Sequence, residues 1–275
     1  MLNTQDHRRD SAGMKYIYPV ISRRAGGVSI GINLNVNNAC NWACKYCQVP
    51  NLRRGKPPPI DLQKLETELR DFLRSADDFL TTNVPPEVRQ IIDIALSGNG
   101  EPTSASEFPT VVDIAEKVLN DFDLHNRVKL RLITNGSLMH RPYVQQGIAR
   151  IGTLTGEVWF KVDRGTREGT DLVNGISMEP ARIKNSLLIC AELAPTWVQS
   201  CFFAIDGKSI DDKEFSAYLD IIRTVQSKIR GVFLYGLARP SQQPDANRLS
   251  ALSAESLSYY SEIISTLGIK VIVTP

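Results

Sequence analysis

Short strand-like segments alternate with longer helix-like segments along the sequence from about residue 28. Six segments of six to nine residues are rich in apolar and β-branched residues, at 28–36, 91–96, 128–133, 157–162, 197–205 and 232–237. Between and after them, apolar residues recur at helical spacing over 62–73, 111–119, 138–150, 180–193, 215–229 and 257–267. Such an alternation predicts parallel βα units, in which each helix returns the chain to the start of the next strand.

Six such units are too few to close the usual eight-unit barrel. We therefore expect an α/β fold with a partial (β/α)6 TIM-like barrel, to which residues 271–273 add an edge strand. The sequence contains no internal repeat, low-complexity stretch or linker that would divide the barrel. The expected organisation is an N-terminal extension over 1–27, followed by a single partial-barrel domain over 28–275.

The composition is that of an ordinary soluble globular protein, with 42% hydrophobic and 23% charged residues. No apolar stretch approaches the roughly 18 residues that span a bilayer, and the first residues lack the apolar core of a signal peptide. Five cysteines, an odd number with three of them clustered, do not indicate a disulfide framework. We therefore expect a cytoplasmic protein without membrane association.

Positive charge is concentrated at the start of the chain. Residues 1–56 carry nine Lys or Arg and two acidic residues, a net charge of +7, whereas residues 57–275 carry a net charge of −5. Two interpretations follow: a surface that binds RNA or another anion, or a basic face exposed to solvent.

Three cysteines, Cys40, Cys44 and Cys47, stand within eight residues after the first expected strand, in a Cys-x3-Cys-x2-Cys spacing. Three thiolates can hold three irons of a four-iron cluster, whereas ferredoxin-type proteins supply four cysteines. The next cysteine, Cys190, is 143 residues downstream. One iron would therefore remain open, and an open metal position is typical of a catalytic site rather than a structural one.

Other uses of the three cysteines explain less of the sequence. A zinc site needs four ligands, and the three histidines are scattered without ligand spacing. A thiol redox motif needs only two cysteines and leaves Cys40 unexplained. A non-catalytic iron–sulfur electron carrier needs a fourth ligand from a distant part of the chain. Cys190 and Cys201, which fall within an expected helix and an apolar strand, are expected to pack in the core.

The cysteine spacing, with Tyr46 immediately before the last cysteine, resembles that of the radical S-adenosylmethionine (SAM) superfamily. The resemblance implies a [4Fe-4S] cluster held by Cys40, Cys44 and Cys47, with SAM bound to the open iron. It also implies an enzyme that cleaves SAM reductively to methionine and a 5′-deoxyadenosyl radical, which takes a hydrogen atom from a substrate. A one-electron reductant such as flavodoxin or ferredoxin is then an expected partner.

Two later segments match further elements of this family. The turn Gly98-Asn99-Gly100-Glu101-Pro102 resembles the Gly-Gly-Glu-Pro-type motif that holds the amino group of SAM. Its glycines permit close approach of the backbone to a ligand. Lys161 and Asp163 are two apart on one strand and so face the same side, where they would meet the SAM carboxylate and ribose. The alternative is that these two charges only pair with each other.

Three more residues are candidates near the ends of strands. Asn135 resembles a ribose- or substrate-facing element of the family, although Asn-Gly is also an ordinary turn. Arg239 follows the last expected strand, and its planar guanidinium suits a carboxylate or phosphate on a substrate. Tyr235, four residues earlier, shares its face. A structural ion pair is the alternative role for Arg239.

The segments 22–34, 161–163 and 235–240 resemble a subgroup related to the wyosine-tRNA synthesis enzymes, so that the likeness covers about residues 20–240. The chain lacks the second set of clustered cysteines that archaeal wyosine enzymes carry. Two substrate classes therefore compete. A small metabolite or peptide fits the compact size and is slightly favoured, whereas the basic first 56 residues favour tRNA.

Overall fold

The computed structural model describes residues 2–3, 12–23, 25–154 and 156–275. Its central element is an eight-stranded sheet in the order β1-β2-β5-β6-β7-β8-β10-β12. These strands are β1 (Ile17–Ser22), β2 (Gly27–Ile32), β5 (Ile91–Leu96), β6 (Lys129–Thr134), β7 (Glu157–Lys161), β8 (Thr196–Cys201), β10 (Gly231–Tyr235) and β12 (Val271–Thr274). Neighbouring strands are parallel except for β1, which pairs with β2 in antiparallel register from Ile17↔Ile32 to Ser22↔Gly27.

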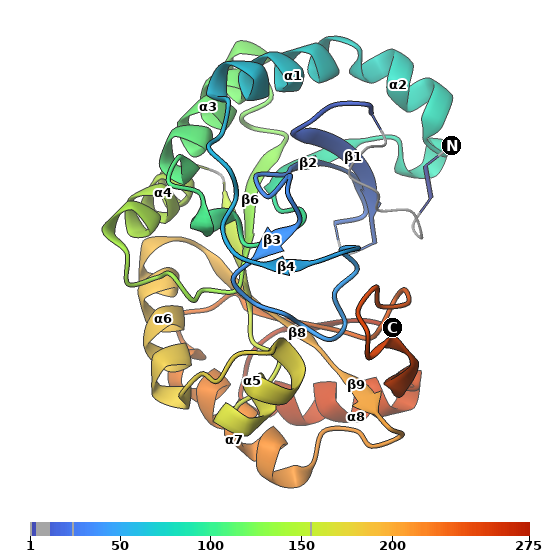
Figure 1. The fold of residues 1–275 in the computed structure, drawn as a ribbon, viewed down its shortest axis with the longest axis vertical. Coiled ribbons are helices and arrows are strands. Elements are labelled where there is room, and N and C mark those ends of the chain that lie inside the picture. The colour runs from blue at the N-terminus through green and yellow to red at the C-terminus, as the bar shows by residue number, and fades with distance from the viewer. Residues whose placement is uncertain (1, 4–11, 24, 155) are drawn as a thin grey trace.

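Helices surround the curled sheet on its outer side (Figure 1). One follows each of six parallel strands: α1 (Leu62–Arg74), α3 (Phe108–Asp121), α4 (Pro142–Thr153), α6 (Pro180–Leu193), α7 (Asp212–Val225) and α8 (Ala254–Ser265). Their apolar faces and the outward-facing side chains of the strands form the main hydrophobic core. The partial (β/α)6 barrel expected from the sequence is confirmed.

Helix α1 illustrates how the sequence specifies these helices. The Asp61 side chain accepts a hydrogen bond from Lys64 N at 3.0 Å and so caps the first turn, as expected for an aspartate at this position. Leu65, Leu69 and Phe72 recur at helical spacing and are buried against the sheet. The Asp61 cap determines where the helix begins, and the row of apolar residues determines which face it buries.

The expected strands at 28–36 and 197–205 are each shorter in the structure. β2 ends at Ile32, because the side chain of Asn33 turns the chain by accepting a hydrogen bond from Asn35 N at 3.1 Å. β8 ends at Cys201, whose N–H donates to Asp163 Oδ1 at 2.9 Å instead of to a neighbouring strand. The following residues form β9 (Phe203–Ile205), which pairs with β11 (Leu249–Ala251) in a separate antiparallel ribbon.

The sequence did not predict several short elements. They include β1, the helices α2 (Ala76–Asn83) and α5 (Arg167–Asn174), the pair β3 (Ala39–Cys40) and β4 (Arg53–Arg54), and three 3₁₀ turns at Pro86–Val88, Pro102–Ser104 and Ala246–Arg248. The pair β3–β4 crosses the mouth of the barrel (Figure 1). α5 lies between the fourth expected strand, β7, and α6. Its N-cap Thr166 accepts from Gly169 N, and Gly175 ends it with a positive φ of 62°.

A buried ionic network occupies the lower end of the barrel, near the amino ends of the strands. Arg131 on β6 lies between Asp93 on β5 and Glu157 on β7, and its Nε is 2.7 Å from Glu157 Oε1. Asp93 also accepts from Ser29 Oγ, and Glu157 from Trp159 Nε1 at 3.0 Å. Burial raises the pKa of Asp93. Burial would also raise the pKa of Glu157, but Arg131 holds it below its usual value. The network closes the floor of the barrel.

The two edges of the sheet, β1 and β12, are not paired with each other in the described residues. The Arg23 guanidinium spans the gap and donates to the Pro275 carbonyl at 3.0 Å. Among the helices that the structure describes, none has the length and apolar character needed to cross a bilayer.

Replacing Arg131 with methionine is expected to destabilise the fold by about 3–5 kcal/mol, because two buried carboxylates would lose their shared cation. Urea denaturation measures this change. Arg150, a half-exposed residue with Glu116 at 2.5 Å, provides the control, and Arg150→Met should cost no more than about 1 kcal/mol. Equal losses for the two variants would contradict the role given to Arg131.

Candidate functional site

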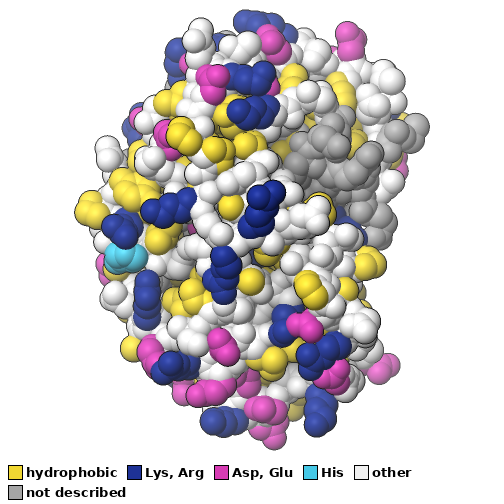
Figure 2. Space-filling model, viewed as in Figure 1, with side chains coloured by type: hydrophobic (Ala, Val, Ile, Leu, Met, Phe, Trp, Pro, Cys, Tyr) yellow, Lys and Arg dark blue, Asp and Glu magenta, His cyan; other side chains and the backbone are white. Residues whose placement is uncertain are grey.

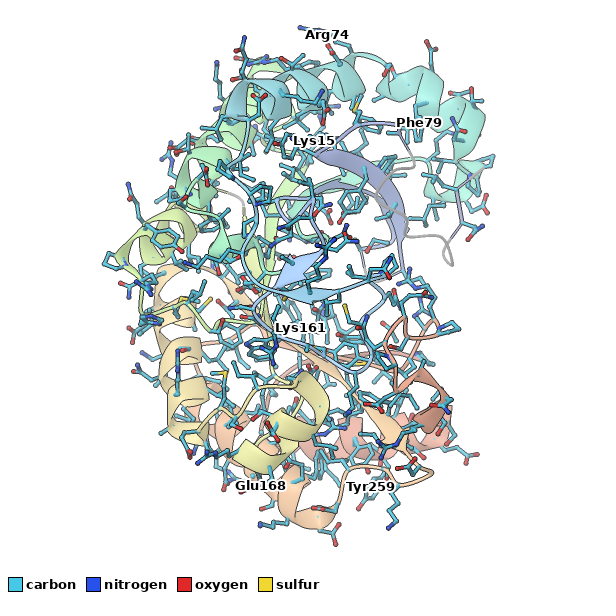
Figure 3. The ribbon with its side chains drawn as sticks, in the orientation of Figure 1. Lys15, Arg74, Phe79, Lys161, Glu168 and Tyr259 are labelled. Atoms are coloured by element: carbon cyan, nitrogen blue, oxygen red, sulfur yellow. The ribbon has the colours of Figure 1, made fainter. Side chains whose placement is uncertain are left out.

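A cavity of about 300 Å³ lies at the mouth of the barrel, at the carboxyl ends of the strands. It brings together residues that are far apart in the sequence, among them Lys161, which lies inside the ring of helices in Figure 3. The expected site residues that line it are Cys40, Cys44, Tyr46, Cys47, Gly98, Asn99, Gly100, Glu101, Asn135, Lys161, Tyr235 and Arg239. Asp163 does not line this cavity, because it is turned into the protein below.

The cysteine loop is fixed to the barrel through its backbone. Ala43 N donates to Asn174 O at 3.0 Å, and Lys45 N donates to Val173 O at 2.8 Å. Both acceptors belong to the end of α5, so this helix supports the loop from below. On the other side, Gly55 N donates to Cys40 O at 3.1 Å as part of the β3–β4 pair. The loop is therefore held independently of any group bound to its thiols.

The segment after β10 holds the same loop from the opposite wall. Gln242 N donates to Cys47 O at 2.9 Å, and Ser241 Oγ donates to Lys45 O at 2.5 Å. The Gln243 side chain donates to Cys47 O at 3.1 Å and to Val49 O at 2.8 Å. Lys45 also forms an ion pair with Asp245. Residues almost 200 positions apart thus define the path of the last cysteine.

The thiols are partly buried and receive hydrogen bonds from N–H groups. Burial raises the pKa of the Cys40 thiol to about 11 and that of the Cys44 thiol to about 12. Trp42 N donates to Cys40 Sγ at 3.4 Å, and Asn174 Nδ2 donates to Cys44 Sγ at 3.3 Å. Such donors favour the anionic form of sulfur and so act against the effect of burial. A bound metal would have to displace protons from these thiols.

The glycine turn packs directly against the start of the cysteine loop. Gly98 has a φ of +146°, and a Cβ there would lie 2.4 Å from Asn33 Oδ1. A Cβ on Gly100 would lie 2.2 Å from the carbonyl oxygen of Ala39. Asn33 Oδ1 also accepts from Asn99 N at 3.0 Å and so shapes the turn. Gly98 is therefore required by its positive φ and by the close approach of the Asn33 side chain, and Gly100 by the close approach of the Ala39 backbone.

The Glu101 carboxylate is buried and bonded within the protein. It accepts hydrogen bonds from Thr103 N at 3.1 Å, Thr103 Oγ1 and Thr134 Oγ1 at 2.7 Å, and Asn135 N at 2.7 Å. Burial raises the pKa of Glu101, while these hydrogen bonds act in the opposite direction. The carboxylate thereby ties the end of β5 to the end of β6. The part of this turn that is available to a ligand is its backbone.

Asn135 is likewise bonded to the protein. Its Nδ2 donates to Asn41 Oδ1 at 2.9 Å, and its Oδ1 accepts from Ser137 N at 3.0 Å and Ser137 Oγ at 2.7 Å. Asn41 directly follows Cys40 in the cysteine loop, and its Nδ2 donates to Ser137 Oγ at 2.7 Å. Asn135 therefore connects the end of β6 to the cysteine loop, and its contact with a ribose or substrate stays a prediction.

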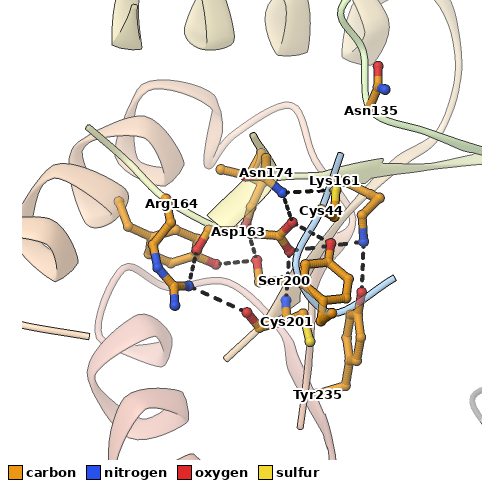
Figure 4. Close-up of polar contacts among 12 residues, drawn as sticks. Cys44, Asn135, Lys161, Asp163, Arg164, Asn174, Ser200, Cys201 and Tyr235 are labelled. Atoms are coloured by element: carbon orange, nitrogen blue, oxygen red, sulfur yellow. Dashed lines mark hydrogen bonds and ion pairs between the residues drawn. The ribbon is translucent and has the colours of Figure 1, made fainter. Parts of the chain in front are cut away.

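Asp163 lies at the centre of a buried polar cluster (Figure 4). Its Oδ2 accepts from Tyr46 Oη at 2.5 Å and from Asn174 Nδ2 at 2.8 Å, while its Oδ1 accepts from Cys201 N at 2.9 Å. The side chain is 0% exposed. The family resemblance assigns Asp163 a ribose contact, and this stays a prediction. In the structure both carboxylate oxygens already serve the protein.

Lys161 extends into the cavity between two aromatic rings. Its Nζ lies 2.9 Å from Tyr235 Oη, 4.9 Å from the centroid of the Tyr46 ring and 4.0 Å from Asp163 Oδ1. Burial would lower the pKa of Lys161, but the Asp163 charge outweighs this effect and raises it. Lys161 is therefore a cation at neutral pH, held at the wall of the cavity where an anionic group can approach.

Basic residues are spread over the face that carries the cavity (Figure 2). Arg53 and Arg54 on β4 are exposed beside the cysteine loop, and Arg23 and Arg239 line the cavity. Arg54 NH1 donates to the Asn41 carbonyl at 2.5 Å. Arg8, Arg9 and Arg24, which contribute to the basic start of the sequence, lie outside the described residues. Cys190 is buried in α6, as expected, and Cys201 is buried at the cavity wall.

Sequence reasoning missed the residues that support the site, namely Asn33, Asn41, Asn174, Ser241 and Gln243. Asn33 and Asn41 stand close to the cysteines, and a side-chain amide at the end of a strand is a common turn signal. Asn174, Ser241 and Gln243 are distant in sequence, so only the fold brings them to the cysteine loop.

Among the described residues, no three His, Cys, Asp or Glu side chains are gathered around one point as ligands of a single metal ion. A mononuclear site requires such convergence. A four-iron cluster does not, because each thiolate binds a different iron. The donor set, three thiols along one cavity of which two accept N–H···S hydrogen bonds, has the chemistry of cluster ligands.

Comparisons of sequence identify distant relatives. No protein-family profile matches the chain. A UPF0026 protein of Helicobacter pylori is 29% identical over 132 residues, which are 47% of this chain and 37% of that protein. A corresponding protein of a second H. pylori strain matches to the same extent. The chain thus spans well under half the length of these relatives.

Comparisons of structure establish the fold. A radical SAM methyltransferase from Sphaerobacter thermophilus is similar with a TM-score of 0.63 and 13% identity, over 94% of this chain and 68% of that one. SuiB of Streptococcus suis, in a structure bound to S-adenosylmethionine, is similar with a TM-score of 0.58 and 13% identity, over 86% of this chain and 48% of that one. The partial barrel is therefore the fold of radical SAM enzymes of known structure.

Replacing Glu101 with glutamine is expected to destabilise the protein by about 1–3 kcal/mol, because an amide NH2 would face donors that now share the carboxylate. Urea denaturation measures the loss. Glu168→Gln, at an exposed position in α5, is the matched control and should leave stability nearly unchanged. A Glu101 variant as stable as this control would refute the role of the carboxylate as a tie between β5 and β6.

Proposed function

We propose that this protein is a radical SAM enzyme that holds a [4Fe-4S] cluster through Cys40, Cys44 and Cys47. One observation carries the proposal: the three thiols, the backbone of the glycine turn and the Lys161 ammonium, all expected from the family resemblance, line one cavity. When bound, the cluster supplies the electron for cleavage of SAM to methionine and a 5′-deoxyadenosyl radical, which takes a hydrogen atom from the substrate. The chain's own residues position the groups and exclude water.

The contacts of the cysteine loop support this assignment. Two of the three thiols accept hydrogen bonds from N–H groups, which stabilise cluster thiolates and adjust their reduction potential. The loop is anchored by α5 and by the segment after β10, so the thiols are placed before a cluster is bound. The raised pKa values of the Cys40 and Cys44 thiols mean that binding of a cluster releases protons, as expected for thiolate ligation.

The SAM contacts that we propose include hydrogen bonds to the backbone, an ion pair with a side chain and van der Waals contact with an aromatic wall. Residues 98–101 line the cavity, and their carbonyl oxygens would accept from the SAM ammonium, whereas the Lys161 ammonium would pair with the SAM carboxylate. Tyr46 forms part of the wall, stacked edge-on against Phe203 at 5.5 Å. Three other expected residues would position these contacts without touching SAM, because their polar atoms are hydrogen-bonded within the protein: Asp163, Glu101 and Asn135.

For the substrate, we propose a small metabolite or a peptide. The cavity has a volume of about 300 Å³ and enters the barrel, where a small molecule or a single side chain fits. A tRNA substrate of the wyosine type is a second candidate, which the exposed Arg53 and Arg54 beside the cysteine loop favour. Retention on RNA that does not change between low and moderate salt would argue against phosphate contacts.

Anaerobic reconstitution with iron and sulfide, reduction and addition of SAM should yield 5′-deoxyadenosine, quantified by chromatography. Cys44→Ala should lose both the brown colour of the cluster and the product. Cys190→Ala is the matched control and should retain both, since Cys190 Sγ is buried 3.5 Å from Thr196 Oγ1 in α6, away from the cavity. An intact cluster that yields no 5′-deoxyadenosine would falsify the proposal and favour an electron carrier.

Lys161→Met should leave the cluster intact and weaken SAM binding about ten- to a hundredfold, the usual worth of a charge-assisted hydrogen bond. Equilibrium binding of SAM to the reconstituted protein measures the change. Lys117→Met, at an exposed lysine on α3, is the control. If both variants bind SAM as the native protein does, Lys161 has no role in holding the SAM carboxylate.

A further inference from the structure

Gln199 is a buried polar side chain on the inner face of the barrel. It stands on β8 in register with Lys161 on β7 and with Phe233 on β10, and it lines the same cavity as the three cysteines. Its side chain is 1% exposed. Its Nε2 has no hydrogen-bond partner within the part of the chain that the structure describes.

An unpaired amide donor at such depth is uncommon in proteins. The great majority of buried polar atoms have a partner, and leaving one without a partner costs free energy. A leucine at this position would fill nearly the same volume without that cost. A donor that faces a cavity is therefore best explained by an acceptor that arrives with a ligand.

Gln199 lies beside Lys161 and below the mouth of the barrel. Cys201, the next inward-facing residue on β8, is in register with Tyr235 at the mouth, whereas Gln199 is in register with Lys161. One layer further into the barrel, the cavity wall includes Trp159, which is in register with Trp197 on β8 and with Ile133 on β6. The Trp159 ring packs 4.8 Å from that of Phe233. The lower cavity is thus largely aromatic and apolar.

Several other polar groups that line the cavity are bonded to one another. Arg131 pairs with Asp93 and Glu157, and its guanidinium lies 4.7 Å from the centre of the Trp159 ring. Tyr18 Oη and Ser97 Oγ are 2.9 Å apart. Among the described residues that line the cavity, Gln199 Nε2 and Trp42 Nε1 are buried donors without a partner. A few such polar groups on a largely apolar wall are the pattern by which a pocket orients a small molecule.

We propose that Gln199 is a substrate-binding residue that donates from Nε2 to an acyl oxygen, the carbonyl or carboxylate of a small molecule, whose flat apolar part lies against Trp159. The Lys161 ammonium, in register with Gln199 on the neighbouring strand, favours an acceptor over a second donor. This inference rests on the proposed function only in calling the ligand a substrate. The binding itself requires neither the cluster nor SAM.

The test uses the full-length protein without iron or SAM and three probes of one shape: benzoate, benzamide and benzylamine. NMR titration follows the side-chain amide resonances of Gln199. Benzoate and benzamide should shift them saturably, and comparison of the two reveals whether carboxylate or carbonyl is preferred. Benzylamine, which offers a donor in place of the acyl oxygen, should not. A response to benzylamine equal to that of benzoate would overturn the proposal, as would no response to benzoate or benzamide.

Two variants make the test independent of any one substitution. Gln199→Leu should weaken benzoate binding at least about tenfold, the loss expected for one hydrogen bond to a buried amide. It should also melt at a temperature equal to or above that of the native protein, since no paired donor is lost. Gln199→Glu keeps the shape but presents a carboxylate, and should abolish benzoate binding. Gln226→Leu, at an exposed glutamine after α7, is the control.

The outcomes separate this inference from the proposed function. Unchanged benzoate affinity in Gln199→Leu and Gln199→Glu would overturn the inference, and so would a lower melting temperature of Gln199→Leu with benzoate affinity intact, which would make Gln199 a purely structural residue. Because no cluster is present, these results do not depend on cleavage of SAM. Absence of 5′-deoxyadenosine in the reconstituted protein would instead contradict the proposed function and leave the binding result standing.

Discussion

The Asp163 carboxylate joins the cysteine loop to the barrel, and much of the site depends on it. It accepts a hydrogen bond from Tyr46 in the cysteine loop. It also accepts from the Asn174 side chain at the end of α5, which in turn donates to Cys44 Sγ. Its third donor is the N–H of Cys201, where β8 ends. Lys161 supplies the countercharge at 4.0 Å. A buried carboxylate is tolerated because each oxygen accepts hydrogen bonds and a cation stands beside it. The buried Asp163 charge, although costly, thus also determines the positions of Tyr46, Asn174 and Cys201.

The same logic appears at two other points along the barrel. Glu101 uses one carboxylate to connect the ends of β5 and β6, and Arg131 uses one guanidinium to connect β5 and β7 at the floor. In each case a buried charge acts across strands that hydrogen bonds of the sheet already align. Glu101 thus ties strand ends in the upper layer, where the cysteines, the glycine turn and Lys161 meet, and Arg131 ties strands at the floor.

Sequence reasoning reached the fold because strand and helix periodicity are local properties. The six βα units and the cap at Asp61 follow from spacing alone. β1 was missed because it lies in a segment that showed no clear alternation, and its place at the sheet edge is set by pairing with β2. The expected site residues do meet in one cavity, but the sequence could not show that Asp163, Glu101 and Asn135 are bonded inward. Which partner a polar side chain finds depends on packing between distant segments.

The gap between β1 and β12 gives the barrel a lateral seam. The eight strands form a continuous ladder from one edge to the other, and the side-chain bridge from Arg23 to the Pro275 carbonyl crosses between those edges. Widening the seam therefore breaks no hydrogen bond of the ladder, unlike the opening of a closed barrel. A molecule much larger than the cavity can insert one reactive group while its bulk remains outside. The volume of the cavity therefore limits the size of the group that enters it, not the size of the molecule that carries that group.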